Sequence, residues 1–286
     1  MSLLLGAACV VSANASPPRA IDERLLEQDR ATMTLPPLQR IEGLVRTYEA
    51  WMPAGTGKGT CSRLATEDVE PGFRATAHLA KYVADDTWLA RLQCFHDALE
   101  ARGLASSTYR DDFIDALVAM RRFPEANRLI AQGQTSRQRL PVIDDDVRSQ
   151  QGVLELQPGG RVRWKPWYYR AGWEVIAFVH PRCGFSRRAL ARISRDPSWS
   201  WLRSRLRLVV QRGPRWAEEG VRQWNALNPG LPMQLQAGAA GWERLDSYET
   251  PVFHLLRNGK IESTVVGWQD DGVQLDAFRA RMVRGL

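Results

Sequence analysis

The segment Glu174–Ile193 reads EVIAFVHPRCGFSRRALARI. Its apolar run at residues 174–179 predicts a buried β-strand, and the pattern of residues 187–193 predicts a helix that begins beside Cys183. A thiol in the first turn of a helix faces unpaired backbone amides and the positive end of the helix dipole, which favour the thiolate. Arg182 adds positive charge next to it. The sequence therefore indicates Cys183 as a candidate nucleophile, although a lone cysteine is also commonly buried and inert.

A second segment, residues 249–268, reads ETPVFHLLRNGKIESTVVGW. Two β-rich runs flank Asn258–Gly259, a step that suits the positive φ angles of a tight hairpin turn. Thr250–Pro251 precedes the first run, at a place where a central strand tolerates a proline. The bond before Pro251 has two alternatives: an ordinary trans strand start, or a cis bond retained for a purpose.

Taken together, the two segments resemble the thioredoxin superfamily, in which a cysteine-bearing helix lies beside a Thr-Pro or Val-Pro cis turn. The resemblance covers roughly residues 172–285. It implies an α/β thioredoxin-like C-terminal domain in which Thr250 and Pro251 bind the backbone of a client protein close to Cys183.

The tetrapeptide Cys183–Ser186 reads CGFS and is similar to the motif of monothiol glutaredoxins, which in that family holds an iron–sulfur cluster with glutathione. The segment Gly267–Asp270 reads GWQD and lacks that family's Gly-Gly-x-Asp loop, and the strand before Cys183 contains no lysine. The hairpin is more similar to that of a thioredoxin or a periplasmic disulfide isomerase. We therefore expect no iron–sulfur role and no cofactor.

Ser186 stands where dithiol members of the superfamily carry a second, resolving cysteine. A single thiolate can form a mixed disulfide with a client, but it has no neighbour in the motif that would expel the client. The remaining possibilities are isomerisation, trapping of client thiols or disulfides, resolution by an external thiol reductant, and no redox chemistry at all. In the first three, Cys183 is the nucleophile, Arg182 stabilises its thiolate and Ser186 hydrogen-bonds the sulfur.

The N-terminus indicates export. Residues 1–15 read MSLLLGAACVVSANA, an apolar stretch that ends in an Ala-x-Ala cleavage pattern, as in a signal peptide. No basic residue precedes this stretch, so the signal is atypical or the true start differs. No other stretch reaches the 18 or so apolar residues that a spanning helix needs. We expect a periplasmic or secreted protein without a transmembrane segment.

Export changes the reading of the cysteines, because Cys9 leaves with the signal and three remain in an oxidising compartment. Cys61 and Cys94 both lie in the N-terminal half, so the simplest expectation is that they pair and leave Cys183 free. The alternative is two buried free thiols.

Four regions are expected along the chain: the signal at 1–15, a helical domain at 16–135, a polar linker at 136–151 and the thioredoxin-like domain at 152–286. The helical domain is predicted from apolar residues at spacings of three and four. The predicted helices are Ile21–Arg30, Leu38–Trp51, Gly72–Val83, Thr87–Arg102, Tyr109–Arg121 and Glu125–Gln132. A hairpin flanking residues 157–160 is predicted to add an edge to the second domain's sheet.

The composition supports no further class of function. The net charge is +7 and the pI about 9.6, but the positive charge is nearly all arginine, scattered among acids, which argues against a nucleic-acid site. The four histidines show no paired metal-ligand spacing, so no metal is expected. Two hypotheses remain: thiol–disulfide exchange on client proteins, or a non-catalytic thioredoxin-fold adaptor in an envelope assembly.

Overall fold

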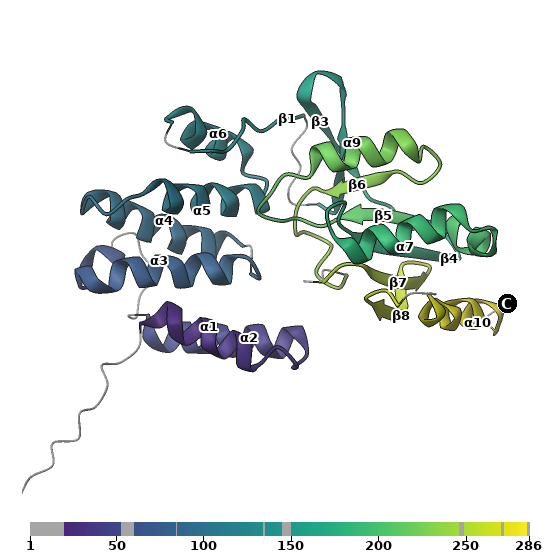
Figure 1. Ribbon diagram of the computed structural model, residues 1–286, viewed down its shortest axis with the longest axis horizontal. Coiled ribbons are helices and arrows are strands. Elements are labelled where there is room, and N and C mark those ends of the chain that lie inside the picture. Colours follow the sequence, from purple (N-terminus) through teal and green to yellow (C-terminus); the bar gives the residue numbers. More distant parts are fainter. Residues whose placement is uncertain are drawn as a thin grey trace, which may run out of the picture.

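The computed structural model describes residues 20–52, 60–83, 85–133, 135–144, 150–245, 249–269 and 272–284. The expected signal at residues 1–15 lies outside these ranges. Within them, helices make up the first half of the chain and a single eight-stranded sheet organises the second (Figure 1). No helix in the described part is both long and apolar enough to cross a membrane.

Six α-helices occupy the described N-terminal part. They are α1 (Ile21–Ala31), α2 (Pro37–Trp51), α3 (Thr66–Ala80), α4 (Asp86–Ala101), α5 (Ser107–Ala119) and α6 (Phe123–Ala131), with a short 3-10 turn, η1 (Cys61–Arg63), before α3. Two of the helices have side-chain caps. The carboxylate of Asp85 accepts a hydrogen bond from the Trp88 amide at 2.9 Å, and the hydroxyl of Ser106 accepts one from the Tyr109 amide at 3.3 Å.

Helix α3 begins at Thr66, six residues before the start predicted from the sequence. The Pro71–Gly72 pair predicts a helix boundary, but both residues lie inside the helix. Pro71 costs one backbone hydrogen bond, which the full burial of Val69 and Phe73 on the same helix offsets. Gly72 is needed for a different reason: a Cβ there would lie 2.3 Å from the Phe95 ring on α4.

The helical domain has its own apolar core, built around side chains such as Phe73, Leu92 and Leu117. Cys61 of η1 and Cys94 of α4 form a disulfide at this core, with their Cα atoms 5.8 Å apart. The bridge joins residues 33 apart in sequence and fastens η1 to α4. It belongs to a different domain from Cys183, the free cysteine of the described residues.

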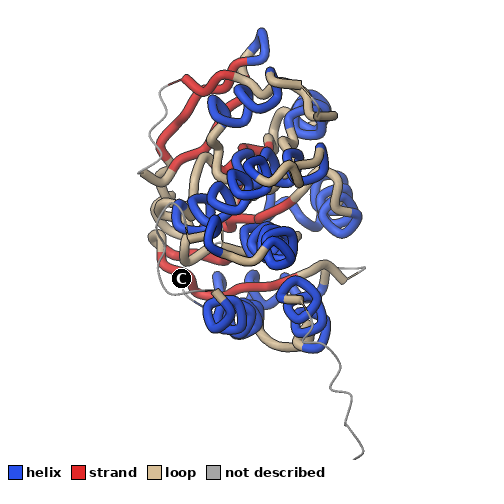
Figure 2. The backbone as a smooth tube through the Cα atoms, turned by 90° about the vertical axis from the view of Figure 1, so that its left-hand side faces the viewer, coloured by secondary structure: helices blue, strands red, loops and turns tan. Residues whose placement is uncertain are grey.

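The sheet has the strand order β1-β3-β2-β6-β5-β4-β7-β8. Its strands are β1 (Val142–Asp144), β2 (Gly152–Leu156), β3 (Arg161–Pro166), β4 (Trp173–Val179), β5 (Leu206–Val210), β6 (Met233–Gln236), β7 (Val252–Arg257) and β8 (Lys260–Val266). Strands β4, β5 and β6 run parallel, whereas β7 is antiparallel to β4 and to β8. Figure 2 shows the strands in red, viewed from the side of the helical domain.

Four helices accompany this sheet: α7 (Gly184–Arg195), α8 (Ser200–Arg203), α9 (Glu218–Leu227) and α10 (Asp276–Arg284). The parallel unit β4-α7-β5, joined to the antiparallel unit β7-β8-α10, is the arrangement of the thioredoxin-like fold. The expected fold class, an all-α domain followed by a thioredoxin-like α/β domain, is confirmed.

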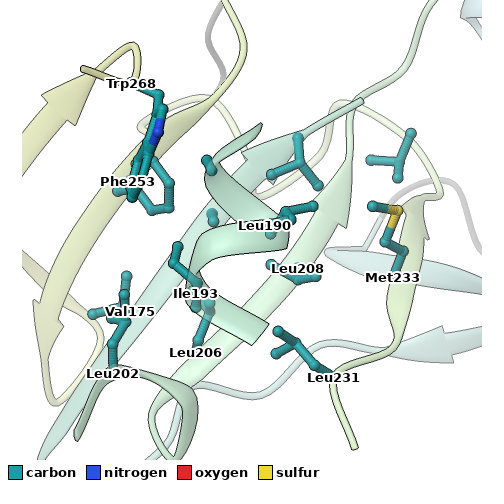
Figure 3. Close-up of a cluster of buried hydrophobic side chains, with 14 of the residues drawn as sticks. Val175, Leu190, Ile193, Leu202, Leu206, Leu208, Leu231, Met233, Phe253 and Trp268 are labelled. Atoms are coloured by element: carbon teal, nitrogen blue, oxygen red, sulfur yellow. The ribbon is translucent and has the colours of Figure 1, made fainter. Parts of the chain in front are cut away.

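Both faces of the central strand β4 are buried, which explains its continuous apolar sequence. Val175, Ala177 and Val179 share a core with residues of α7, α9 and α10, part of which is drawn in Figure 3. Ile176 and Phe178 point to the opposite face, because side chains alternate along a strand. There they pack with Trp167, Trp242 and Leu245, which come from loops. These five residues and four more, Val153, Val209, Val252 and Leu256, form a second cluster.

Two strands differ from the sequence-based expectation. Strand β6 was not predicted from the sequence, and it fills the place between β5 and β2. With only four residues it has too little alternation to predict. Strand β1 lies within the segment 136–151 expected to link the domains, and it pairs in parallel with β3. The predicted hairpin is present as β2 and β3.

The two domains meet around the buried side chain of Arg121, which is 1% exposed. Arg121 lies in the turn between α5 and α6 with a φ of 58°. Its Nε donates to the carbonyl of Gln236 on β6 at 3.1 Å, and its guanidinium lies 5.0 Å from the ring centre of Trp216. Phe123 packs edge-on against the same tryptophan at 5.0 Å. A residue of the helical domain thus bonds directly to the second domain's sheet.

We expect the disulfide to contribute substantially to stability. Replacing Cys61 and Cys94 together by alanine should lower the free energy of unfolding by about 3 to 4 kcal/mol, because the bridge closes a loop of about 34 residues in the unfolded chain. Denaturant unfolding without reductant measures the change, and Cys183→Ala, which leaves the bridge intact, is the control. Equal stability of the double variant and this control would contradict the expectation.

We also expect stability to fall in mild acid because of His254. Its Nδ1 lies 2.9 Å from the Thr264 hydroxyl and its Nε2 lies 3.1 Å from the Leu245 carbonyl, so Nε2 carries the proton of the neutral ring. Burial lowers the pKa of His254 from 6.5 to about 4, against the opposing effect of the Leu245 hydrogen bond.

Above the unfolded pKa of 6.5 the His254 ring is neutral in the folded and the unfolded chain, so its ionisation does not change the free energy of unfolding. As the pH falls from 6.5 towards 4, only the unfolded chain takes up the proton, so folding loses on the order of 3 kcal/mol. Denaturant unfolding across this range should show the loss, and His254→Gln should flatten the slope. An unchanged slope in the variant would assign the acid sensitivity to other groups.

Candidate functional site

The turn that carries Cys183 follows directly from the end of β4. The amide of Cys183 donates to the carbonyl of His180 at 3.0 Å and closes the turn, and the amide of Arg187 donates to the carbonyl of Cys183 at 2.9 Å as the first bond of α7. Cys183 is therefore the N-cap residue of α7. This position brings its sulfur close to the free amides at the start of the helix.

The sulfur of Cys183 lies against the turn that leads into β7. The thiol donates to the carbonyl oxygen of Thr250 at 3.2 Å, and the bond between Thr250 and Pro251 is cis. The carbonyl of Pro251 accepts from the amide of Gly267 at 2.8 Å and so is used within the hairpin. Cys183 as a residue remains partly exposed.

Ser186 lies beneath the sulfur and is fully buried. Its Oγ accepts a hydrogen bond from the backbone amide of His180 at 3.2 Å. Because that bond uses the oxygen as an acceptor, the hydroxyl proton is available for donation to Cys183. Ser186 thus occupies the place of a resolving cysteine and acts as a hydrogen-bond donor to the sulfur.

The pKa of Cys183 is lowered from its ordinary value. Burial is the largest single effect and opposes ionisation, but hydrogen bonds from the side chains of Thr250 and Ser186 and from the amides of Ser186 and Phe185 together outweigh it. These donors are neutral. The thiolate is therefore favoured by the local geometry of the helix start.

Arg182, expected from the sequence to stabilise the thiolate, is not among these causes. Its side chain is exposed and lines a cavity on the side of the helical domain. Its backbone amide donates to Nδ1 of His180 at 3.2 Å. The pKa of His180 is lowered mainly by burial of the ring and, to a smaller extent, by the charge of Arg182. The structure thus brings Cys183, Ser186, Thr250 and Pro251 together, and turns the Arg182 side chain to a different surface.

A shallow hollow of about 510 Å³ lies beside the sulfur, and the sequence reasoning did not identify its apolar lining. Phe185 and Val266 line it and are 53% and 54% exposed, and Trp268 contributes to the same wall. The guanidinium of Arg188 lies 4.6 Å from the ring centre of Phe185 and supports it from one side. Two features of the sequence could have indicated this hollow. They are the aromatic residue Phe185, two positions after Cys183, and the outward-facing position of Val266 on β8.

One group of potential metal ligands occurs among the described residues, namely His96, Asp97 and Glu100 on α4. Asp97 and Glu100 are exposed, and Asp97 accepts a hydrogen bond from Gln93. These residues belong to the helical domain and take no part in the arrangement around Cys183.

Comparisons with known proteins give a fold-level likeness only. No family model and no curated protein matches the chain. Among solved structures, StoA from Bacillus subtilis is similar with a TM-score of 0.33 and 17% identity, over 47% of this chain and 98% of StoA. A putative thioredoxin from Neisseria meningitidis has a TM-score of 0.31 and 18% identity, over 49% of this chain and 92% of its own.

A thioredoxin-like protein from Bacteroides caccae is similar along almost the whole chain. Its TM-score is 0.32 and its identity 12%, over 96% of this chain and 97% of its own. The strand order and the strand directions establish the thioredoxin-like fold independently of these scores.

The site predicts a measurable role for the Ser186 hydroxyl. Ser186→Ala should raise the pKa of the Cys183 thiol, because it removes one donor to the thiolate and leaves the backbone amides in place. Ultraviolet absorbance of the thiolate against pH measures this shift. Ser194→Ala, on the same helix, removes a hydroxyl that donates to the Ala191 carbonyl and should leave the titration unchanged. Superimposable titrations of Ser186→Ala and wild type would exclude the role.

Proposed function

We propose that the chain is an exported thioredoxin-like protein that forms mixed disulfides with client proteins through Cys183, in thiol–disulfide exchange or in an isomerase-like cycle. The observation that carries the proposal is the state of this one residue. Cys183 is partly exposed, the pKa of its thiol is lowered, and its sulfur lies 3.2 Å from the carbonyl oxygen of Thr250. A buried structural thiol does not combine these properties.

The reaction begins when the thiolate of Cys183 attacks one sulfur of a client disulfide. The client S–S bond breaks, a bond forms between Cys183 and the attacked sulfur, and the other client sulfur leaves as a thiolate that takes a proton from water. In isomerisation, another client thiolate attacks the mixed disulfide, forms a new client disulfide and returns the electron pair to Cys183. If an external thiolate attacks the sulfur of Cys183 instead, the client leaves as a thiol and Cys183 is left in a disulfide with the external thiol. A second external thiol then reduces this disulfide and returns Cys183 to the thiolate.

The surroundings of the sulfur support binding of an extended client segment. Thr250 and Pro251 would contact its backbone, and the exposed faces of Phe185 and Val266 would contact apolar side chains next to the client cysteine. Export is proposed from the apolar sequence of residues 1–15 and is consistent with the disulfide between Cys61 and Cys94, since such bridges persist in oxidising compartments.

The absence of a second thiol in the motif gives the sharpest test. Wild-type protein should accumulate mixed disulfides with a model disulfide near neutral pH, whereas Ser186→Cys should release the client faster by about tenfold or more, because the introduced thiol attacks intramolecularly. Mass spectrometry of acid-quenched samples measures the lifetime of the adduct.

Two controls accompany this experiment. Cys183→Ala should form no adduct, and Ser186→Ala should form one that is as long-lived as the wild-type adduct, because it lacks a resolving thiol. If wild-type protein forms no adduct at any pH at which the thiol ionises, the proposed function fails and the adaptor hypothesis is favoured.

A further inference from the structure

A cavity of about 690 Å³ lies between the two domains. Its walls come from α5 and α6, from residues 136–140 where the chain leaves the helical domain, and from residues 214–219 at the start of α9. Arg182 reaches it from the turn before α7. Because Cys183 is the next residue, the cavity opens within one residue of the nucleophile.

Seven of the fifteen residues that line this cavity are charged, and some of them pair with one another or with a neighbouring residue. The lining includes Arg137, Arg139, Arg182, Arg215, Asp115, Glu218 and Glu219. Asp115 accepts a hydrogen bond from Arg137 at 2.7 Å. Glu218 accepts from Arg222 at 2.8 Å and from the indole of Trp216 at 2.9 Å. Two of the three carboxylates are therefore already engaged.

Three arginines remain, and we call them the cavity arginines: Arg139, Arg182 and Arg215. All three are exposed, and their side chains make no hydrogen bond or salt bridge with any residue that the structure describes. The remaining carboxylate of the lining is Glu219, which makes no such bond with the described residues. A concave surface with surplus positive charge attracts anions, and guanidinium groups bind carboxylates through paired hydrogen bonds.

We propose that the cavity arginines bind acidic residues of the client segment that carries the attacked cysteine, so that acidic disulfide peptides are the preferred substrates. This inference rests on the proposed function of Cys183. A peptide occupant is favoured over a small free anion because residues on either side of Cys183 belong to the two surfaces. Thr250, in the apolar hollow, contacts the sulfur, and Arg182, in the cavity, immediately precedes it. One segment seated at Cys183 can engage both.

The test uses the full chain and three peptides that differ only in the residues flanking a single cysteine, which are glutamates, glutamines or lysines. Each cysteine is activated as a mixed disulfide with thionitrobenzoate, whose release reports attack by Cys183. The measured quantity is the ratio of second-order rate constants for the acidic and the neutral peptide. A ratio cancels any effect of a variant on the nucleophilicity of the sulfur itself.

For wild-type protein at low salt we expect the acidic peptide to react about tenfold faster than the neutral one, and the basic peptide to react slowest. The triple variant Arg139→Gln, Arg182→Gln and Arg215→Gln should bring the acidic-to-neutral ratio close to one. Arg195→Gln, which removes an exposed arginine from the far end of α7, should retain the wild-type ratio. The replaced side chains are exposed, so the variants keep their packing.

Each outcome decides one claim. Equal rates for the three peptides with wild-type protein would overturn the acidic preference while leaving the reactive Cys183 intact. A preference that survives in the triple variant, or that Arg195→Gln abolishes equally, would assign it to net charge and not to the cavity. Free citrate is also added to both reactions. If it slows the reaction of the neutral peptide as strongly as that of the acidic peptide, the cavity is a site for small anions instead. No reaction with any peptide would sink the proposed function itself.

Discussion

The antiparallel pairing of β4 with β7 is the constraint on which the rest of the site depends. Phe178 near the end of β4 lies opposite Val252 at the start of β7. The chain leaving β4 therefore passes the chain entering β7, and this places the sulfur of Cys183 3.2 Å from the Thr250 carbonyl although the residues are 67 apart in sequence. Both faces of β4 are buried, so the register is strongly specified, because a one-residue slip would exchange its two faces.

A second constraint fixes the helical domain against this sheet. Arg121 carries a buried charge that has no carboxylate partner among the residues that the structure describes. It relies on the carbonyls of Gln236 and Val118 and on the face of Trp216. Burial, with the charge of Arg212, lowers its pKa to about 9, so it stays protonated at neutral pH. Because a buried guanidinium is costly without its acceptors, separating β6 from the α5–α6 turn is unfavourable. Trp216, which takes part in this contact, also lines the cavity that Arg182 reaches.

Local signals predicted much of this structure from the sequence. The cysteine turn, the capped helices and the hairpin around Asn258–Gly259 each depend on neighbouring residues, and Asn258 adopts the expected positive φ of 49°. What the sequence did not predict depends on distant partners: β6 is a strand because β5 and β2 flank it, and Gly72 lies inside a helix because Phe95 approaches it. The convergence of Arg139 and Arg215 on the cysteine turn likewise arises only when the two domains pack together.

Different groups in this structure favour ionisation of Cys183 and line the surface beside it. Ionisation of Cys183 is favoured by neutral donors, the amides at the start of α7 and the Ser186 hydroxyl, which are fixed by the helix and by β4. Arg182 is thereby left exposed, with its charge directed to the interdomain cavity. Under the proposed function, reactivity is a property of the thioredoxin-like domain alone, whereas client selection requires both domains. The helical domain would then contribute specificity without touching the sulfur, which is a physical reason for the two domains to be fastened together by a buried side chain and not merely tethered.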